Sequence, residues 1–175
     1  MTAEARRGPV IFLCTGNAAR SVMAGAALGA LAPGRSVRTA GTLVVEGQPM
    51  SWRTRAALES VGVAIPDHRS RQAPATDLSH AELVIALAPE HVEWVRRSHP
   101  AAADRTATLR RLARDLRPGP APLAARVRAL SLAEVALEPW EEVIDPGGGD
   151  AETFARCAVE VTELVRTLAP LLGEP

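Results

Sequence analysis

The strongest constraint on the fold is a strand, loop and helix pattern close to the start of the chain. Residues 10–13 are all apolar, and their branched and aromatic side chains are typical of a strand that is covered on both faces. The alanine-rich stretch from Arg20 to Leu31 predicts an amphipathic helix. The loop between them therefore opens onto a helix N-terminus, where free N–H groups and the helix dipole favour an anion.

The loop carries residue types that suit a phosphate-binding site with its own nucleophile. It begins with Cys14, ends with Arg20, and contains Gly16, which lets the backbone curl closely round a ligand. A helix N-terminus and an arginine both favour the thiolate form of a cysteine. The guanidinium offers a planar fork to two oxygens of a tetrahedral oxyanion. A thiolate beneath a phosphate group held in this way is a nucleophile aimed at phosphorus.

The spacing of cysteine and arginine is by itself a weak signal, because chance produces it often. Taken alone, it favours a buried cysteine at a strand end and an arginine on the surface. The functional interpretation is favoured by the context: the strand before the loop, the Gly16-Asn17 pair within it, and Ser21 with a helix after it.

The whole loop sequence, Cys14-Thr15-Gly16-Asn17-x-x-Arg20-Ser21, resembles that of the low-molecular-weight protein tyrosine phosphatases and the related cysteine-based arsenate reductases. Further segments are similar to the same family and occur in the same order. They are Thr39-Ala40-Gly41-Thr42 followed by Gly47-Gln48-Pro49, then His68-Arg69-Ser70-Arg71-Gln72, and finally Asp145-Pro146 before the last helix. The resemblance covers most of the chain and leaves out residues 117–141.

The resemblance implies hydrolysis of a phosphomonoester through a phosphocysteine intermediate, without a metal or another cofactor. In that reaction Cys14 attacks phosphorus, and Asp145 protonates the leaving oxygen and later deprotonates water. Arg20 and the amides of the loop hold the equatorial oxygens of the phosphoryl group. The expected phosphate-binding residues are therefore Thr15, Gly16, Asn17, Ala18, Ala19 and Arg20.

Supporting residues are expected around the loop. Asn17 is expected to hold the strained turn of the loop through side-chain hydrogen bonds, with Ser21, Thr39 and His68 as supports. In the family, this histidine hydrogen-bonds the serine that follows the loop arginine. We therefore expect His68 to brace Ser21, whose hydroxyl can in turn donate to the thiolate. Cys157, inside the last helix, is predicted to be a small buried hydrophobic residue.

Strands alternate with helices along the rest of the chain, which indicates an α/β sheet. Further strands are predicted at 36–40, 82–87 and 106–109, and further helices at 51–61, 89–97 and 151–168. The resemblance implies a flavodoxin-like three-layer sandwich, with a four-stranded parallel sheet and helices on both faces. Ligands of such sheets bind at the carboxyl ends of the strands, which is where Cys14 is expected.

The length of 175 residues suits one domain, so residues 1–175 are expected to form a single low-molecular-weight phosphatase-like domain. The segment at about 117–141 is expected to be extra to the compact members of the family. A proline-rich stretch opens it, and an amphipathic helix is predicted from Leu123 to Val135. A packed surface decoration is favoured here over a mobile flap or a docking surface.

The composition limits the binding partners and the cellular compartment that are expected for this chain. The 20 basic residues balance the 20 acidic ones, so no strong field attracts nucleic acid or an anionic membrane. Two cysteines are too few for a disulfide framework, and neither a signal peptide nor a membrane-spanning apolar run is evident. We therefore expect a cytoplasmic monomer whose partner is a phosphorylated protein or a small phosphomonoester.

The departures from the family pattern concern the substrate. Gly147 and Gly148 stand where phosphotyrosine-specific members carry an aromatic wall, and the loop from Leu43 to Glu46 is shorter and lacks an aromatic residue. Ala19 replaces a thiol that many members have in the loop. Phosphotyrosine is the substrate that the family implies, while phosphoarginine and a smaller phosphate stay open. We expect weak discrimination between aryl phosphates of different shape.

Two other functions also stay open on the sequence alone. An arsenate reductase that uses an external small thiol needs only Cys14. The thioredoxin-coupled form needs two further thiols and is disfavoured, since Cys157 is the one other cysteine. A non-catalytic module that binds a phosphorylated ligand is the second alternative, and the joint presence of Cys14, Arg20 and Asp145 argues against it.

Overall fold

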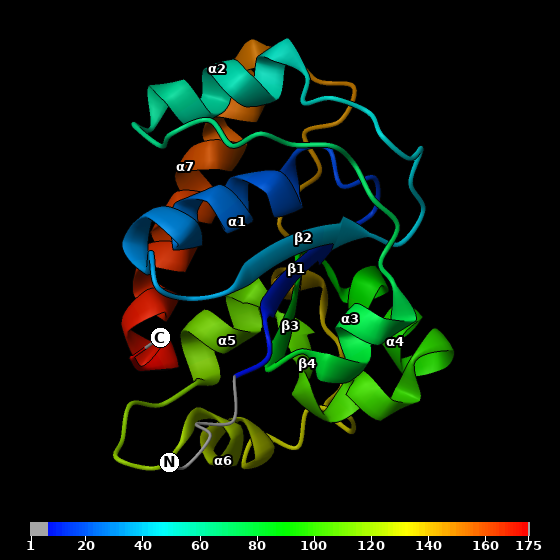
Figure 1. The fold of residues 1–175 in the computed structure, drawn as a ribbon, viewed down its shortest axis with the longest axis vertical. Coiled ribbons are helices and arrows are strands. Elements are labelled where there is room, and N and C mark those ends of the chain that lie inside the picture. Colours follow the sequence, from blue (N-terminus) through cyan, green and yellow to red (C-terminus); the bar gives the residue numbers. More distant parts are fainter. Residues whose placement is uncertain (1–6, 175) are drawn as a thin grey trace, which may run out of the picture.

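The computed structural model describes residues 7–174, in which a central sheet lies between two layers of helices (Figure 1). The four strands of this described region are parallel, in the order β2-β1-β3-β4. They are β1 (Val10–Cys14), β2 (Val37–Gly41), β3 (Leu83–Ala86) and β4 (Thr106–Thr108). The flavodoxin-like α/β fold, with a four-stranded parallel sheet and helices on both faces, is thereby confirmed.

Seven α-helices and three short 3₁₀ helices connect the strands within residues 7–174. The α-helices are α1 (Arg20–Leu31), α2 (Trp52–Ser60), α3 (Ala75–His80), α4 (Pro89–Ser98), α5 (Leu109–Asp115), α6 (Leu123–Arg128) and α7 (Ala151–Leu168). The 3₁₀ helices are η1 (Pro100–Arg105), η2 (Pro139–Glu141) and η3 (Ala169–Leu172). In this part of the chain, no helix combines the length and the apolar character that crossing a membrane requires.

The fourth strand is shorter than predicted. The sequence pattern includes Leu109 in it, but the strand ends at Thr108 and helix α5 begins at Leu109. The Thr108 hydroxyl accepts a hydrogen bond from the N–H of Arg111 at 3.1 Å and so caps α5. The prediction does not include α5 or α3, because helices of seven and six residues are too short for a recognisable period.

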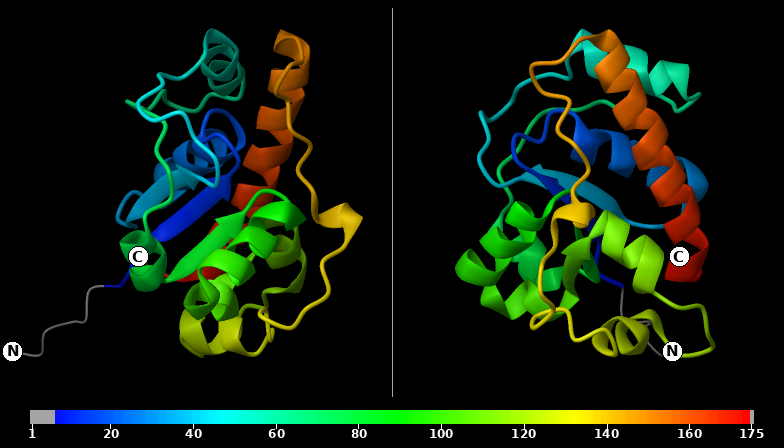
Figure 2. Two further views of the ribbon diagram at one scale, coloured as in Figure 1. Left: turned by 90° about the vertical axis from the view of Figure 1, so that its right-hand side faces the viewer. Right: turned by 180° about the vertical axis from the view of Figure 1, so that it is seen from behind.

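The two faces of β1 contribute to two separate cores. Val10, Phe12 and Cys14 belong to the larger core, which α1, α2, α5 and α7 cover. Ile11 and Leu13 belong to the smaller core under α3 and α4. Figure 2 shows these helices on the two sides of the sheet. Burying one large apolar side chain is worth about 1.5–3 kcal/mol, so this alternation holds β1 firmly in the middle of the molecule.

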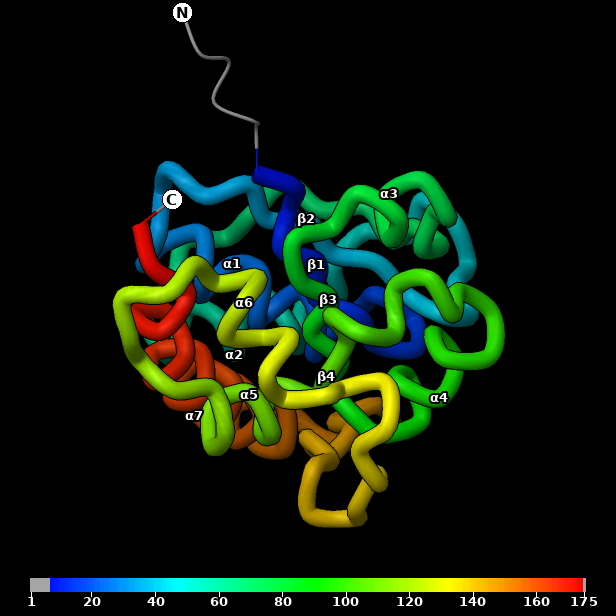
Figure 3. The backbone as a smooth tube through the Cα atoms, turned by 90° about the horizontal axis from the view of Figure 1, so that it is seen from below, coloured from blue at the N-terminus to red at the C-terminus, as the bar shows by residue number. Residues whose placement is uncertain are grey.

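The segment 117–141 contains a shorter helix than predicted. Helix α6 ends at Arg128 instead of Val135, and Ser131 then takes a φ of 51°. This left-handed conformation cannot continue a right-handed helix. Figure 3 shows the segment crossing the molecule below the strands. Some of its apolar side chains still pack into the larger core: Leu123, Val127 and Leu132.

Candidate active site

Strand β1 delivers Cys14 to the carboxyl edge of the sheet, and a short loop leads from it into α1. We refer to residues 14–20 as the cradle loop. Its cysteine is buried. Among residues 7–174, the main-chain N–H groups of Gly16 to Ala19 find no acceptor in the protein. Successive free N–H groups at a helix N-terminus form a binding site for an anion.

The end of β2 supports the cradle loop from one side. The N–H groups of Thr42 and Leu43 donate to the carbonyl oxygens of Cys14 and Thr15, at 2.9 and 3.0 Å. A Cβ atom on Gly41 would lie 2.3 Å from the Thr15 carbonyl oxygen. The close approach of the two segments therefore requires glycine at this position.

Asn17 holds the turn of the cradle loop. Its φ of 50° is left-handed, a conformation that asparagine tolerates better than most residues. Its Nδ2 donates to the hydroxyl oxygens of Ser21 at 2.9 Å and of Thr39 at 3.0 Å. Its Oδ1 accepts the N–H of Arg71 at 3.0 Å. Because both ends of this buried amide are bonded, the loop is held in one shape.

The Ser21 hydroxyl lies next to the nucleophile candidate. Ser21 Oγ and Cys14 Sγ are 3.0 Å apart, and both side chains are buried. Because the Ser21 oxygen already accepts from Asn17 Nδ2, its own hydrogen is free to donate to sulfur. A donor in this position stabilises negative charge on the sulfur.

His68 does not brace Ser21, and this expectation was wrong. Its Nε2 donates to the main-chain oxygen of Asn17 at 2.8 Å, and Ser70 Oγ donates to the same oxygen at 2.9 Å. The Ser21 hydroxyl is already engaged by Asn17 and by Cys14, which both belong to the cradle loop. His68 therefore supports the loop through the backbone of Asn17.

Arg20 joins the cradle loop to a distant part of the chain. It is 2% exposed, and its Nη1 donates to the Val143 carbonyl oxygen at 3.0 Å. Its Nη2 donates to Oδ2 of Asp145 at 3.2 Å. The Asp145 side chain is 55% exposed, and its Oδ1 accepts the N–H of Gly147 at 2.9 Å. A partly exposed carboxyl group therefore stands beside the loop that holds the buried sulfur.

The chain matches a known protein family over more than half of its length. Residues 9–119 match the profile of a family described as low molecular weight phosphotyrosine protein phosphatase. The chain belongs to this family. The predicted resemblance is thereby confirmed. The matched residues include the cradle loop and β2 and end before Asp145.

Individual relatives extend the match to most of the chain. The low molecular weight protein-tyrosine-phosphatase of Streptomyces coelicolor is 32% identical over 168 residues, covering 90% of this chain and 88% of that protein. The protein-arginine-phosphatase of Geobacillus stearothermophilus is 27% identical over 164 residues, covering 93% and 95%. A solved structure of the arginine phosphatase from that organism gives a TM-score of 0.74 at 27% identity, over 93% of this chain and 91% of that one. The chain is a cysteine-based phosphatase.

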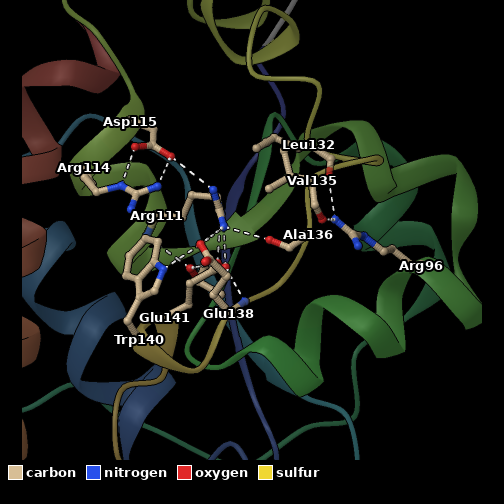
Figure 4. Close-up of polar contacts among 11 residues, drawn as sticks. Arg96, Arg111, Arg114, Asp115, Leu132, Val135, Ala136, Glu138, Trp140 and Glu141 are labelled. Carbon is tan, nitrogen blue, oxygen red and sulfur yellow. Dashed lines mark hydrogen bonds and ion pairs between the residues drawn. The ribbon is translucent and has the colours of Figure 1, made fainter.

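The loop that carries Asp145 in this phosphatase follows a buried ion pair. Glu141, at the end of η2, is fully buried and accepts from Thr108 Oγ1 at 2.8 Å and from Arg111 Nε at 3.0 Å. Burial raises the pKa of Glu141, but the hydrogen bonds from Arg111 and Thr108 outweigh it and hold the pKa below its usual value. Figure 4 shows Arg111 between Glu141 and Asp115. We refer to residues 142–150, which include Asp145, as the acid loop, and its start is thus fixed to α5.

Arginines also hold the chain that leads to η2. Arg111 Nη2 donates to the Ala136 carbonyl oxygen at 3.0 Å. Arg96 Nη2 donates to the carbonyl oxygens of Leu132 and Val135, at 2.7 Å each (Figure 4). None of these carbonyl groups belongs to a helix in this structure, and the arginines satisfy them in place of helical hydrogen bonds.

Two tryptophans, Trp140 before Asp145 and Trp52 after β2, contact residues other than Asp145. Trp140 packs against Arg114, whose guanidinium carbon lies 3.9 Å from the ring centroid, and its Nε1 donates to Glu138 at 2.8 Å. Trp52 is exposed at the start of α2, close to Thr54, whose hydroxyl donates to the Ala18 carbonyl oxygen at 3.1 Å. Trp52 is therefore on the α2 side of the cradle loop.

Several groups that contact the cradle loop or its arginine were not predicted. The His91 ring hydrogen-bonds the Thr15 hydroxyl. The hydroxyls of Thr54 and Ser70 donate to main-chain oxygens of the cradle loop. The Val143 carbonyl oxygen accepts from Arg20. The position of His91 in the sequence could have indicated its place, because it follows shortly after a predicted strand, at the sheet edge where ligands bind. The others use hydroxyl or carbonyl groups that no sequence pattern distinguishes.

Proposed function

We propose that this phosphatase removes phosphoryl groups from phosphorylated protein side chains or small phosphomonoesters, with Cys14 as nucleophile, Arg20 as phosphate clamp and Asp145 as general acid. The observation that carries the proposal is the Arg20 guanidinium, which is buried and hydrogen-bonded to both Val143 and Asp145. It connects the loop that contains the cysteine to a carboxyl group 125 residues later in the chain. In-line displacement needs such an acid near the leaving group.

In the first step the Cys14 sulfur attacks phosphorus from the side opposite the leaving group. An S–P bond forms while the bond from phosphorus to the leaving oxygen breaks, and Asp145 transfers its proton to that oxygen. The free N–H groups of the cradle loop and the Arg20 guanidinium hold the equatorial oxygens, where negative charge accumulates. A phosphoarginine substrate would lose its guanidine nitrogen in the same way.

Water hydrolyses the phosphocysteine in the second step. Asp145, now a carboxylate, takes a proton from the water as the water oxygen attacks phosphorus, and the S–P bond breaks. The electron pair returns to the Cys14 sulfur, which the Ser21 hydroxyl at 3.0 Å stabilises as a leaving group. Inorganic phosphate leaves, and Asp145 is protonated for the next turnover.

The groups that we propose to bind the phosphoryl oxygens all belong to the cradle loop. It includes the main-chain N–H groups of residues 15–19 and the guanidinium at the end of the loop. Asn17 keeps these donors in place, with Ser21, Thr39 and His68 as supports. The donors belong to a strand end and a helix start, so they need little reorganisation when charge develops on the phosphoryl group.

Phosphotyrosine and phosphoarginine are the two phosphorylated side chains that we consider as protein substrates. Relatives of similar coverage are named for each of these activities. The exposed apolar side chains next to site segments are mainly aliphatic: Leu43, Val45 and Ile144. An aliphatic rim contacts the stem of arginine or the ring of tyrosine, without the extra stabilisation that paired aromatic rings provide. We therefore propose that both substrates are accepted.

We further propose that the protein acts as a monomer in the reducing environment of the cytoplasm. Both cysteines are free thiols, and the proposed chemistry needs an unoxidised Cys14. Cys157 is buried inside α7, which disfavours a disulfide relay and hence a thioredoxin-coupled arsenate reductase.

A turnover panel tests the proposed function. The substrates are a phosphotyrosine peptide, a phosphoarginine peptide, a small aryl phosphate, and arsenate with a small external thiol. We expect the wild-type protein to release inorganic phosphate from the phosphorylated substrates and Cys14→Ser to release none. Reduction of arsenate without release of phosphate from any substrate would instead identify a reductase.

A further inference from the structure

A buried histidine touches the cradle loop at the residue directly after the cysteine. His91 lies in the first turn of α4 and is 1% exposed. Its Nε2 is 2.9 Å from the hydroxyl oxygen of Thr15 and 3.5 Å from Oε1 of Glu90. Its Nδ1 has no hydrogen-bond partner within residues 7–174. None of the roles assigned above accounts for a buried imidazole with one bonded nitrogen.

The surroundings decide the charge of this ring. Burial and then the charge of Arg20 lower the pKa of His91 to about 3, against an opposing effect of Asp145. The N-terminal turn of α4 also disfavours a positive charge. His91 is therefore neutral at neutral pH and carries a single N–H.

The partners of the two ring nitrogens decide where this N–H is. A hydrogen on Nδ1 would be a buried donor without an acceptor, which folded proteins rarely contain. A hydrogen on Nε2 meets the Thr15 oxygen, and the Glu90 carboxylate offers a second acceptor nearby. The N–H is therefore on Nε2, and His91 donates to Thr15. The Thr15 hydroxyl then keeps its own hydrogen for a different acceptor.

We propose that His91 is a positioning residue, which holds the Thr15 hydroxyl so that its hydrogen donates to the phosphoryl group bound in the cradle loop. Thr15 is half-buried and follows Cys14 directly, and its hydroxyl bonds no other group in the described part of the chain. The loop thus contributes one side-chain donor besides its amides and Arg20. This inference rests on the proposed function, because it concerns the same phosphoryl group.

A double-mutant cycle tests the inference. Thr15→Val removes the hydroxyl at nearly constant shape, and His91→Leu removes the ring N–H. The measured quantities are kcat/KM for para-nitrophenyl phosphate and the inhibition constant of inorganic phosphate. We expect His91→Leu to lower kcat/KM about tenfold when Thr15 is present, and less than about twofold in the Thr15→Val background. Equal losses in both backgrounds would show that His91 acts through packing alone and would overturn the inference.

A conservative variant and a spectroscopic measurement provide independent checks. His91→Gln places an amide donor near the position of Nε2, so it is expected to retain most of kcat/KM. A loss as large as that of His91→Leu would contradict the inference. In the wild-type protein, ¹⁵N NMR of the imidazole should show a neutral ring with its proton on Nε2 between about pH 5 and pH 8. A proton on Nδ1 would overturn the inference even if no variant folds.

Failure of the proposed function would give a different result. Turnover that persists in Cys14→Ser would refute the nucleophile and leave the tautomer of His91 unchanged. An additive cycle with an inactive Cys14→Ser would refute the positioning role alone.

Discussion

At the scale of single residues, Asn17 concentrates five hydrogen bonds on one buried position. Two leave its Nδ2, one reaches its Oδ1, and two reach its main-chain oxygen. Their partners come from α1, from β2 and from residues 68–72, which we call the histidine segment: Ser21, Thr39, Arg71, His68 and Ser70. One asparagine thus ties three segments together, and this network keeps the free amides of the cradle loop pointing at one place.

Cys14 is expected to be the reactive thiol of this protein. Iodoacetate should alkylate Cys14 near neutral pH, and phosphate or arsenate should protect it, because the same loop binds the anion. Cys157 should stay unlabelled, since burial raises its pKa to about 12. Mass spectrometry of tryptic peptides after timed labelling measures both rates. Faster labelling of Cys157 would contradict the assignment.

Asp145→Asn is expected to lower turnover by roughly 10²–10⁴-fold, the usual contribution of a general acid. The loss should shrink for leaving groups of low pKa, because these need little protonation, while binding of phosphate should survive. Rates for a series of aryl phosphates measure the trend. Asp104→Asn is the matched control, because Asp104 is exposed in η1, pairs with Arg105, and is expected to leave the trend unchanged. A uniform effect of Asp145→Asn across the series would mean that the acid lies elsewhere, with Asp150 and Asp67 to be tested next.

At the scale of elements, the carboxyl ends of three neighbouring strands hold the site. β1 ends at Cys14, β2 ends at Gly41 against the cradle loop, and the residue after β3, Leu87, accepts the N–H of Val143 at 2.8 Å. The last contact places the acid loop beside β3, and the Arg20 side chain then reaches it. Parallel strands bring their ends to one edge, so segments far apart in sequence meet there.

Gly41→Ala is expected to lower kcat/KM at least about tenfold, because its Cβ would lie 2.3 Å from the Thr15 carbonyl oxygen and 3.0 Å from the Asn17 nitrogen. Both atoms are backbone, so the cradle loop itself must move. Gly29→Ala is the matched control, since Gly29 is half-buried in α1 and a Cβ there meets nothing within 4 Å. Steady-state kinetics with a small aryl phosphate compares the two. Equal activity of both variants would show that the close contact does not shape the loop.

Gly147→Tyr is expected to raise kcat/KM for a phosphotyrosine peptide about tenfold, equivalent to ~1.4 kcal/mol, because it adds a ring beside the proposed acid. A Cβ at this position lies 3.1 Å from Oδ1 of Asp145, so the carboxyl group must shift slightly. Gly147→Ala isolates that crowding without adding a ring. The ratio of the two variants measures the effect of the ring. If the wild type already prefers phosphotyrosine strongly and loses the preference in Trp52→Ala, the wall is supplied by α2 instead.

At the scale of the whole molecule, the chain that leads to the acid loop is fixed by arginines of α4 and α5. Arg96 and Arg111 bind carbonyl oxygens of residues 132–136, and Arg111 also binds the buried Glu141 (Figure 4). A buried carboxylate is tolerated only when its charge is paired and its oxygens are hydrogen-bonded. The two arginines therefore hold the chain that leads into the acid loop.

Arg111→Met is expected to lower the free energy of unfolding by about 3–5 kcal/mol, because it leaves Glu141 buried without its partner. Arg110→Met is the matched control on the same helix. It breaks a partly exposed pair with Glu160 and is expected to lower the free energy of unfolding by less than about 1 kcal/mol. Urea unfolding measures both. Equal effects would mean that the pair does not anchor the segment.

The difference in free energy of unfolding between wild type and Arg111→Met is expected to depend on pH. The pKa of Glu141 is lower in the folded state than its usual value, so its stabilising contribution is fully present above the unfolded value of about 4.3. It is lost as pH falls through the folded pKa. In Arg111→Met the unpaired Glu141 is protonated more readily, so the gap between wild type and variant should be largest near neutral pH and shrink as pH falls. A gap that widens in acid would contradict the role of the carboxylate.

The fold class, the family and the order of the site segments were predictable from the sequence. The buried run of β1, the alanine-rich helix and residues 14–21 are contiguous, so short-range periodicity and spacing describe them well. The N-caps of α2 and α7 are equally local, since Ser51 and Asp150 accept hydrogen bonds from the N–H groups of Thr54 and Thr153. A cap depends on three or four neighbouring residues, which the sequence shows directly.

Contacts over long separations were decided by the tertiary structure alone. Sequence spacing placed His68 near the loop but assigned it the wrong partner, because the Ser21 hydroxyl is occupied from within the loop. The end of α6 was misplaced because Ser131 takes a left-handed φ of 51° and the arginine of α4 binds carbonyl oxygens of the chain that follows. The pairing of Arg20 with Asp145 and the burial of His91 against Thr15 likewise depend on which strand ends are adjacent in the sheet. Local periodicity encodes the elements, whereas the partners of a polar group depend on which groups the packed elements bring within hydrogen-bonding distance.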